Sequence, residues 1–214
     1  TFVSQYERPE WGVSWCGPTS AGMSLAWFAD NGFPDFLKIN DTFTGNASDV
    51  VDEMGKEMDT DPANGTSDAD FVEGLKKYVD DRYPEGFVVK VFNLSNSTED
   101  PSYEVFEREL LDKEDVMVGI AYPTGGGHWV VSDPKTFLTG QGTKKEANTD
   151  GTHNVSLVDP ARGSIDTVMY PNGSIIYNGN LTYTEIIVAV SPIEEGWWDW
   201  TKEYVLGGWL VPWW

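Results

Sequence analysis

Basic residues are scarce in this sequence: 14 lysine and arginine side chains stand against 35 aspartate and glutamate side chains in 214 residues. The resulting net charge of −21 at pH 7 is spread along the chain and is not gathered in a tail. Such a surface repels polyanions, which argues against nucleic acid and anionic lipid as partners. The simplest interpretation of the acidity is solubility, and recognition of a cationic substrate is the alternative.

Long apolar runs are also lacking, so we expect no membrane-spanning helix. No signal peptide is present, but the strand-like residues 1–5 are what a mature chain would begin with after removal of an export signal. Metal-type Cys/His spacings, a P-loop and a dinucleotide fingerprint are all missing, and the acidic clusters lack the spacing of a calcium loop. We therefore expect no metal and no cofactor.

Cysteine is the rarest residue: Cys16 is alone and cannot form a disulfide within the chain. In an oxidising compartment, an unpaired thiol is retained either because it is buried and inert or because its thiolate does chemistry. The residues around Cys16 have to decide between these two interpretations.

Asparagine, in contrast, is concentrated in one context. Eight of the eleven Asn residues begin an Asn-x-Ser/Thr sequon, whereas chance would place about two of them there. This excess predicts export and N-linked glycosylation, and the alternative is a loop composition rich in Asn, Ser and Thr. We therefore expect a secreted or cell-surface glycoprotein. The sequons begin at Asn40, Asn46, Asn64, Asn93, Asn96, Asn154, Asn172 and Asn180.

The secondary-structure pattern changes character at residue 116. Before it, apolar residues at helical spacing predict helices at 16–30, 67–81 and 101–111, with shorter helical pieces around 50–58. After it, strands predominate. The predicted class is α+β, in which a helical first half packs on a mainly antiparallel sheet and a cleft forms where the two meet. Strands are expected at 87–92, 116–122, 128–132, 154–158, 165–170, 174–177 and 185–190.

Cys16 begins the first predicted helix, ahead of the segment Gly-Pro-Thr-Ser at 17–20. The free N–H groups and the positive end of the helix dipole favour a thiolate there. A nucleophilic cysteine needs a base, and the chain has two histidines. His128 follows three glycines and opens an apolar strand, whereas His153 lies in a predicted polar loop. His128 is therefore the candidate base, and a structural histidine at a strand edge is the alternative.

Four motifs follow one another along the chain: Val3-Ser4-Gln5, Trp15-Cys16-Gly17-Pro18-Thr19-Ser20, Gly127-His128-Trp129-Val130-Val131 and Val158-Asp159-Pro160. In this order they resemble the papain-like cysteine peptidases, and among them the branch related to the bacteriocin-processing double-glycine peptidases. The resemblance covers roughly residues 1–192 and implies a papain-like fold with its nucleophile at a helix start.

The resemblance implies a catalytic triad of Cys16, His128 and Asp159, with Gln5 as an oxyanion donor. His128 would take the thiol proton and later protonate the leaving amine, while Asp159 would accept the other ring N–H and fix the tautomer. Gln5 would donate to the oxyanion together with the backbone N–H of Cys16.

Two spacings depart from the family pattern. Gln5 precedes Cys16 by eleven residues, so the loop between them must fold back if Gln5 is to reach the site. The polar stretch 136–153 is predicted to be a loop inserted between His128 and the third triad residue, which makes Asp133 a rival to Asp159. We prefer Asp159 because it ends a separate strand, whereas Asp133 lies about 16 Å along the His128 strand.

Tryptophan is concentrated at the C-terminus, where six of the ten Trp residues fall within the last 18 positions. We therefore divide the chain into a peptidase-like domain at 1–192 and a Trp-rich tail at 193–214. Three interpretations of the tail stay open: it completes the core, it forms a self-association surface, or it binds sugars through its aromatic rings.

Two functions follow from these observations. The first is an exported cysteine peptidase or related amide hydrolase, with a peptide or protein as its substrate and a thioester intermediate. The second is an extracellular structural module, such as a surface-layer or filament subunit, that keeps the peptidase fold but acts by binding. The intact set of candidate residues favours the first, and the dense sequons with the Trp-rich tail favour the second.

Overall fold

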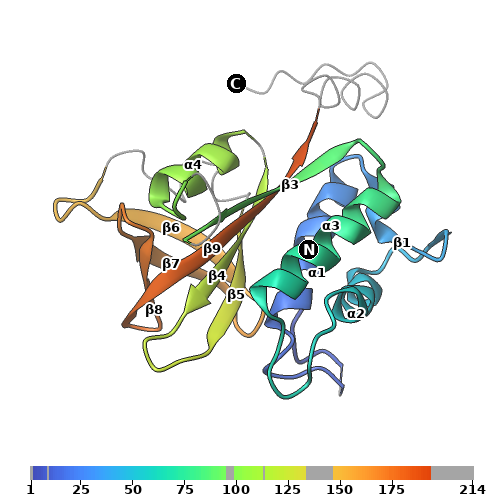
Figure 1. The fold of residues 1–214 in the computed structure, drawn as a ribbon, viewed down its shortest axis with the longest axis horizontal. Helices are drawn as coiled ribbons and strands as arrows, with labels where there is room; N and C mark the ends of the chain where they lie inside the picture. Colours follow the sequence, from blue (N-terminus) through green and yellow to red (C-terminus); the bar gives the residue numbers. More distant parts are fainter. Residues whose placement is uncertain (1, 9, 95–98, 113, 134–146, 194–214) are drawn as a thin grey trace.

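A computed structural model describes residues 2–8, 10–94, 99–112, 114–133 and 147–193. Three helices form one half of the molecule and a seven-stranded sheet forms the other, while a fourth helix lies against the sheet (Figure 1). The helices are α1 (Cys16–Asp30), α2 (Ala47–Glu57), α3 (Asp68–Arg82) and α4 (Tyr103–Leu111), with a 3-10 turn η1 (Pro34–Leu37). The predicted mixture of helix and antiparallel sheet is therefore observed.

All neighbouring strands of the large sheet are antiparallel, in the order β3-β9-β4-β5-β6-β7-β8. Because β8 also pairs with β9, six strands close into a barrel and β3 is left on its outside. The sequence did not predict this closure. The strands are β3 (Phe87–Asn93), β4 (Asp115–Ala121), β5 (Gly127–Ser132), β6 (His153–Asp159), β7 (Gly163–Met169), β8 (Ser174–Tyr177) and β9 (Asn180–Pro192).

Helix α1 is the central element of the helical half, with twelve of its fifteen residues buried. Its small residues let neighbours come close: a Cβ on Gly22 would lie 2.5 Å from the Val51 side chain on α2. The other helices start at side-chain caps, in which Asn46, Ser67 and Ser102 accept backbone N–H groups of α2, α3 and α4. Helix α1 has no such cap, so its first turn keeps N–H groups for other acceptors.

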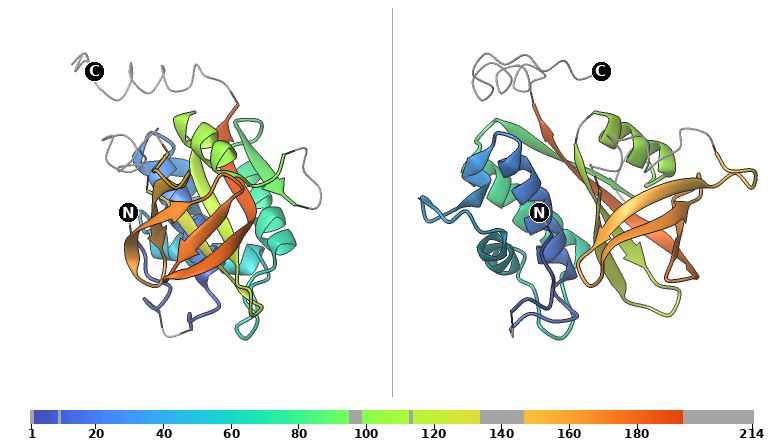
Figure 2. Two further views of the ribbon diagram at one scale, coloured as in Figure 1. Left: turned by 90° about the vertical axis from the view of Figure 1, so that its left-hand side faces the viewer. Right: turned by 180° about the vertical axis from the view of Figure 1, so that it is seen from behind.

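Two apolar cores follow from the two-residue period of the strands. One core lies between the helices and the sheet, where Phe71 of α3 stacks on Trp129 of β5 with ring centroids 3.7 Å apart. The other fills the barrel, and helix α4 lies over it (Figure 2). Phe106 of α4 is wholly buried in this second core. Successive residues of β5 alternate between the two cores, with Trp129 and Val131 in the first and Val130 in the second.

Several expectations about local structure were wrong. Residues 2–5 form no strand; they belong to a loop that lies against the helices and β6. His153 is not in a loop but begins β6, where its ring stacks on Tyr103 at 3.7 Å, because α4 covers this end of the barrel. The small hairpin of β1 (Lys38–Ile39) and β2 (Thr42–Phe43) was not predicted. The expected tail at 193–214, apart from its first residue, and most of the expected loop at 136–153 lie outside the described residues.

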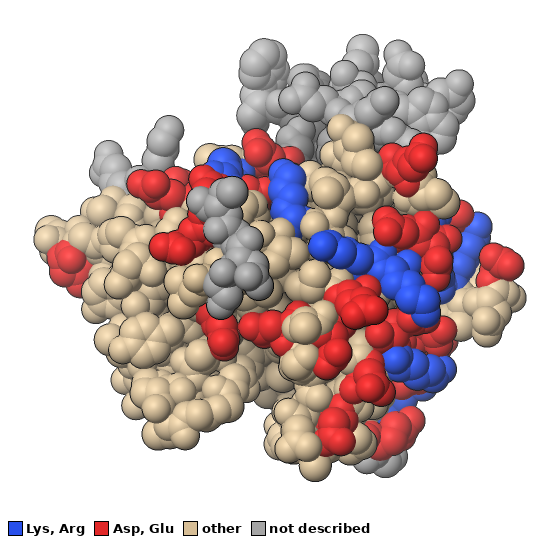
Figure 3. Space-filling model, viewed as in Figure 1, with Lys and Arg blue, Asp and Glu red and all other residues tan. Residues whose placement is uncertain are grey.

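Charge is unevenly distributed over the face shown in Figure 3, where acidic side chains gather over the helices and the lower part of the barrel carries few of them. Within the described residues, no helix is long and apolar enough to span a bilayer.

Candidate active site

The loop before α1 is tied to α2, and this fixes the position of Cys16. The Arg8 guanidinium pairs with Asp49 at 2.5 Å and with Asp52, and Trp11 Nε1 donates to Asp52 at 2.7 Å. Trp11 also stacks on Trp15, with ring centroids 5.6 Å apart. The turn that ends at Trp15 therefore positions Cys16 as the first residue of α1. Cys16 forms no disulfide, and only 8% of its surface is exposed.

His128 reaches the same place from the barrel. It lies two residues before Val130 on β5, so its side chain is on the barrel side of the strand, at the end of the barrel interior. The imidazole hydrogen-bonds to Asp159 through Nε2, at 2.9 Å from Oδ1, and it is close enough to Cys16 for the sulfur to influence its pKa. Because Nε2 is taken by the carboxylate, Nδ1 is the ring nitrogen left for an exchange of protons with the sulfur.

Asp159 ends β6 and is completely buried. Its Oδ1 accepts from His128 and, at 2.8 Å, from the backbone N–H of Ala161. Its Oδ2 accepts from the Tyr177 hydroxyl at 2.5 Å, and Arg162 Nε lies 3.9 Å away. Burial works against the charged form, but these hydrogen bonds hold the pKa of Asp159 below its ordinary value.

The electrostatics of His128 follow from the same contacts. Burial disfavours the imidazolium, yet the hydrogen bonds to Asp159 and Cys16, together with their negative charges, outweigh burial and raise the pKa of His128 to about 9. The ring therefore carries its proton at neutral pH, next to a carboxylate on one side and a sulfur on the other.

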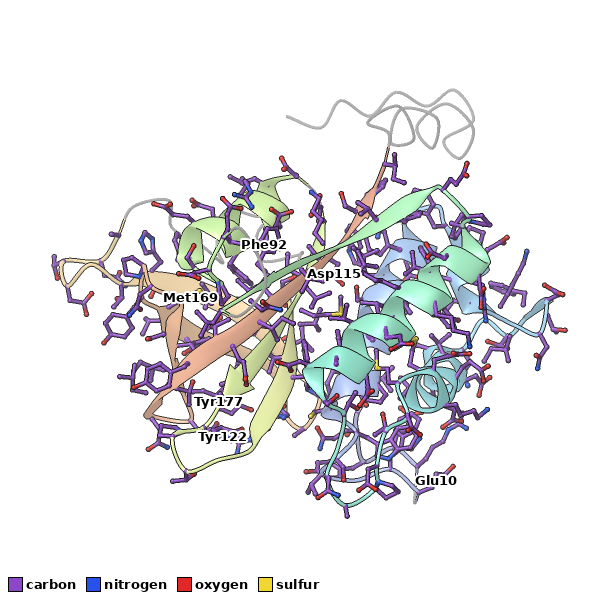
Figure 4. The ribbon with its side chains drawn as sticks, in the orientation of Figure 1. Glu10, Phe92, Asp115, Tyr122, Met169 and Tyr177 are labelled. Atoms are coloured by element: carbon purple, nitrogen blue, oxygen red, sulfur yellow. The ribbon has the colours of Figure 1, made fainter. Side chains whose placement is uncertain are left out.

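Two tyrosines that the sequence analysis missed complete the surroundings. Tyr177 on β8 is 3% exposed, and its ring lies 5.5 Å from that of His128. Tyr122, directly after β4, lies beside Tyr177 at 6.3 Å (Figure 4). Burial, followed by the charges of Cys16 and Asp159, raises the pKa of Tyr122. No motif marks either residue, and Tyr177 reaches this site only because closure of the barrel brings β8 next to β9.

A cleft of about 520 Å³ opens where the start of α1 faces β5, and both Cys16 and His128 line it. Of the residues that the structure describes, two carboxylates, Asp68 and Glu185, line the cleft, and no lysine or arginine does. Burial, and then the charge of Glu185, raises the pKa of Asp68 to about 6. The sequon residue Asn64, in the turn before α3, also borders this cleft.

Gln5 is buried beside the site but is not among the residues that line the cleft. Its loop does fold back: the Gln5 backbone N–H donates to the carbonyl of Pro160, directly after Asp159, at 3.0 Å. The side-chain Nε2 donates to the carbonyl of Gly12 at 3.0 Å, in the turn that precedes Cys16. One hydrogen of that amide nitrogen is thereby used and the second is left.

Asp133 does not face His128. It lies by another cavity, of about 220 Å³, that Trp27 and Ser164 also line, and the Ser164 hydroxyl donates to its Oδ2 at 3.5 Å. The strand runs away from the site at this point, so the structure brings Asp159 to the imidazole and leaves Asp133 elsewhere.

The sequon asparagines are mostly on turns and helix starts. Asn154 on β6 and Asn93 at the end of β3 are half-buried, and Asn96 lies outside the described residues. The exposed ones are Asn40, Asn46, Asn64, Asn172 and Asn180. In the described part of the chain, no group of three or more His, Cys, Asp or Glu side chains is arranged to hold a metal ion.

Comparison with known proteins does not assign this chain to a family. No family model matches the sequence, and no curated protein matches it. Among solved structures, the chain is similar to the Pseudomonas avirulence protein AvrPphB, with a TM-score of 0.36 and 14% sequence identity over 89% of this chain and 97% of that chain. At this level of likeness the functional assignment rests on the geometry of the site.

Proposed function

We propose that this protein is a papain-like cysteine peptidase or a related amide hydrolase, with Cys16 as nucleophile, His128 as acid and base, and Asp159 as the residue that orients His128. The observation that carries the proposal is the chain of contacts from Cys16 through the imidazole to a fully buried carboxylate, at the edge of an open cleft. A base held by a third group and in contact with a nucleophile is the arrangement that covalent acyl transfer requires.

The reaction follows from these positions. With the proton of the Cys16–His128 pair on the imidazole, the sulfur attacks a peptide carbonyl and the carbonyl π electrons move to oxygen. Collapse of this intermediate breaks the C–N bond, and His128 gives its proton to the leaving amine. Water, deprotonated by the now neutral imidazole, then attacks the thioester and releases the acid and the thiolate, while the imidazolium is restored.

The oxyanion would be met by the backbone N–H of Cys16, at the uncapped start of α1, and by the second hydrogen of the Gln5 amide. Removing one such donor lowers the rate by on the order of 100- to 1000-fold. Gln5→Ala is therefore expected to lower kcat far more than it raises KM.

The decisive test is the rate of Cys16 alkylation by iodoacetamide as a function of pH in the wild type and in His128→Ala. The wild type should react fast well below pH 8, and the variant should lose this low-pH limb, because the thiolate then lacks its imidazolium. An ordinary thiol profile in both proteins would reject the peptidase and favour the extracellular structural module. His153→Ala is the matched control and should keep the wild-type profile.

We also propose that the protein is exported and N-glycosylated. The excess of sequons supports this, and so does the exposure of five of the eight asparagines. Glycosidase treatment of protein made in a secretory host should lower its mass, with the exposed sequons occupied and Asn154 empty. Unchanged mass after treatment would contradict the proposal.

A further inference from the structure

The buried carboxylate of the site has a partner whose role the mechanism above does not use. We propose that Tyr177 is a positioning residue, whose hydroxyl fixes Asp159 in the orientation that holds the His128 imidazolium. This inference deepens the proposed function and rests on it.

The two oxygens of Asp159 have separate tasks. Oδ1 meets the imidazole and the backbone N–H of Ala161, whereas Oδ2 receives the Tyr177 hydroxyl at 2.5 Å. Without that hydroxyl, Oδ2 would keep only Arg162 Nε, at 3.9 Å and beyond hydrogen-bond distance. Arg162 is itself bound to Asn178, so its guanidinium is held by another acceptor. The carboxylate could then rotate away from the imidazole.

Tyr177 is rigidly placed to donate in this way. It is 3% exposed on the short strand β8, which is held between β7 and β9 at the point where the barrel closes. Its ring packs against those of His128 and Tyr122, at 5.5 and 6.3 Å. Burial, and then the hydrogen bond to Asp159, raises the pKa of Tyr177 above its ordinary value, so the hydroxyl keeps its proton at neutral pH and donates it to the carboxylate.

The hydrogen bond from the Tyr177 hydroxyl should change the pH at which Asp159 becomes protonated. The titratable and charged groups around Asp159 come from several elements and must be considered together. They are Cys16 on α1, Tyr122 after β4, His128 on β5, Arg162 after β6 and Tyr177 on β8. Since donors hold the pKa of Asp159 low, loss of one raises it. The carboxylate then becomes protonated, and releases the imidazolium, at a higher pH than in the wild type.

The experiment is the iodoacetamide profile of Cys16 in Tyr177→Phe, which keeps the ring and removes the hydroxyl. The low-pH limb should move upward by about one pH unit, the size expected when a charged group loses one hydrogen bond. Tyr183→Phe, at a half-exposed tyrosine of β9, is the matched control and should leave the limb in place. An unshifted limb in Tyr177→Phe would overturn the proposal.

A second substitution covers the case in which Tyr177→Phe does not fold. Site-specific 3-fluorotyrosine at 177 keeps the hydroxyl and makes it more acidic, hence a stronger donor, so the limb should move to lower pH. No movement there would again overturn the proposal. His128→Ala separates the two hypotheses: if it loses the low-pH limb while both changes at 177 leave the limb in place, the peptidase stands and only the role of Tyr177 falls.

Discussion

Replacing Asp159 by asparagine tests the centre of the site with the fewest assumptions. The side chain keeps its size, and its amide can still accept from the Tyr177 hydroxyl, but the negative charge is gone. The change therefore isolates what the carboxylate does to the ionisation of His128.

The structure sets the magnitude. Contacts with Asp159 and Cys16 raise the pKa of His128 from its ordinary 6.5 to about 9 in spite of burial, a difference equivalent to about 3 kcal/mol. In Asp159→Asn, burial persists and the largest favourable contact is lost. We expect the pKa of His128 to fall by about two pH units, toward its ordinary value.

The assay is an NMR titration of the imidazole C–H resonances between pH 5 and 11. The chain has two histidines, so His153→Gln assigns the signals. Asp133→Asn is the matched control, because Asp133 is the nearest alternative in sequence but lies at another cavity. The reasoning is refuted if His128 titrates near 6.5 in the wild type, or if Asp133→Asn moves its pKa and Asp159→Asn does not.

Three further predictions concern the scaffold. Phe71→Ala should destabilise the protein by about 3–5 kcal/mol in urea unfolding, because Phe71 is wholly buried and stacked on Trp129; a loss below about 1 kcal/mol would contradict this packing. Gly55→Ala should lower the free energy of unfolding by about 1–3 kcal/mol, since its Cβ would lie 2.3 Å from the Trp15 ring. Gly12→Ala is the control and should be neutral, because a Cβ there meets nothing within 4 Å. Equal midpoints for the two variants in urea unfolding would reject the predicted clash. Burial, and then the hydrogen bond with Glu109, raises the pKa of Glu114 from 4.5 to about 7. The folded state therefore binds an extra proton between these values, and the free energy of unfolding should decline as the pH rises from 4.5 to 7. Glu114→Gln should flatten this decline in unfolding measured across the range, and an unchanged slope would count against the prediction.

The sequence predicted most helices and strands, because apolar spacing is a local property. Helix α3 was predicted at 67–81 and is observed at Asp68–Arg82, with Ser67 as its cap. Strand β9 was predicted at 185–190 but runs from Asn180 to Pro192, since its first half is exposed on alternate residues and pairs with β8. That pairing closes the barrel, and nothing in the local pattern of β8 specified it.

The residues of the candidate site likewise fall into those that local motifs marked and those that only the strand pairing revealed. Cys16, His128 and Asp159 were proposed from motifs, and the structure brings their side chains into contact. Tyr177 could not be proposed, because its role depends on a strand pairing between residues far from any motif. For Gln5, the sequence identified the residue but not its position. A motif marked it, yet the eleven-residue gap to Cys16 left open where the loop would place its amide. In the structure, the amide donates to the carbonyl of Gly12.

Cys16 belongs to the helical half and His128 to the barrel, and 112 positions of chain separate them. A large loop must therefore close before the two side chains can meet. Only the packing of the helices on the barrel places the imidazole beside the sulfur, so in an unfolded or partly folded chain Cys16 has no histidine next to it. The pairing of Cys16 with His128 is thus a property of the assembled fold and of neither half alone.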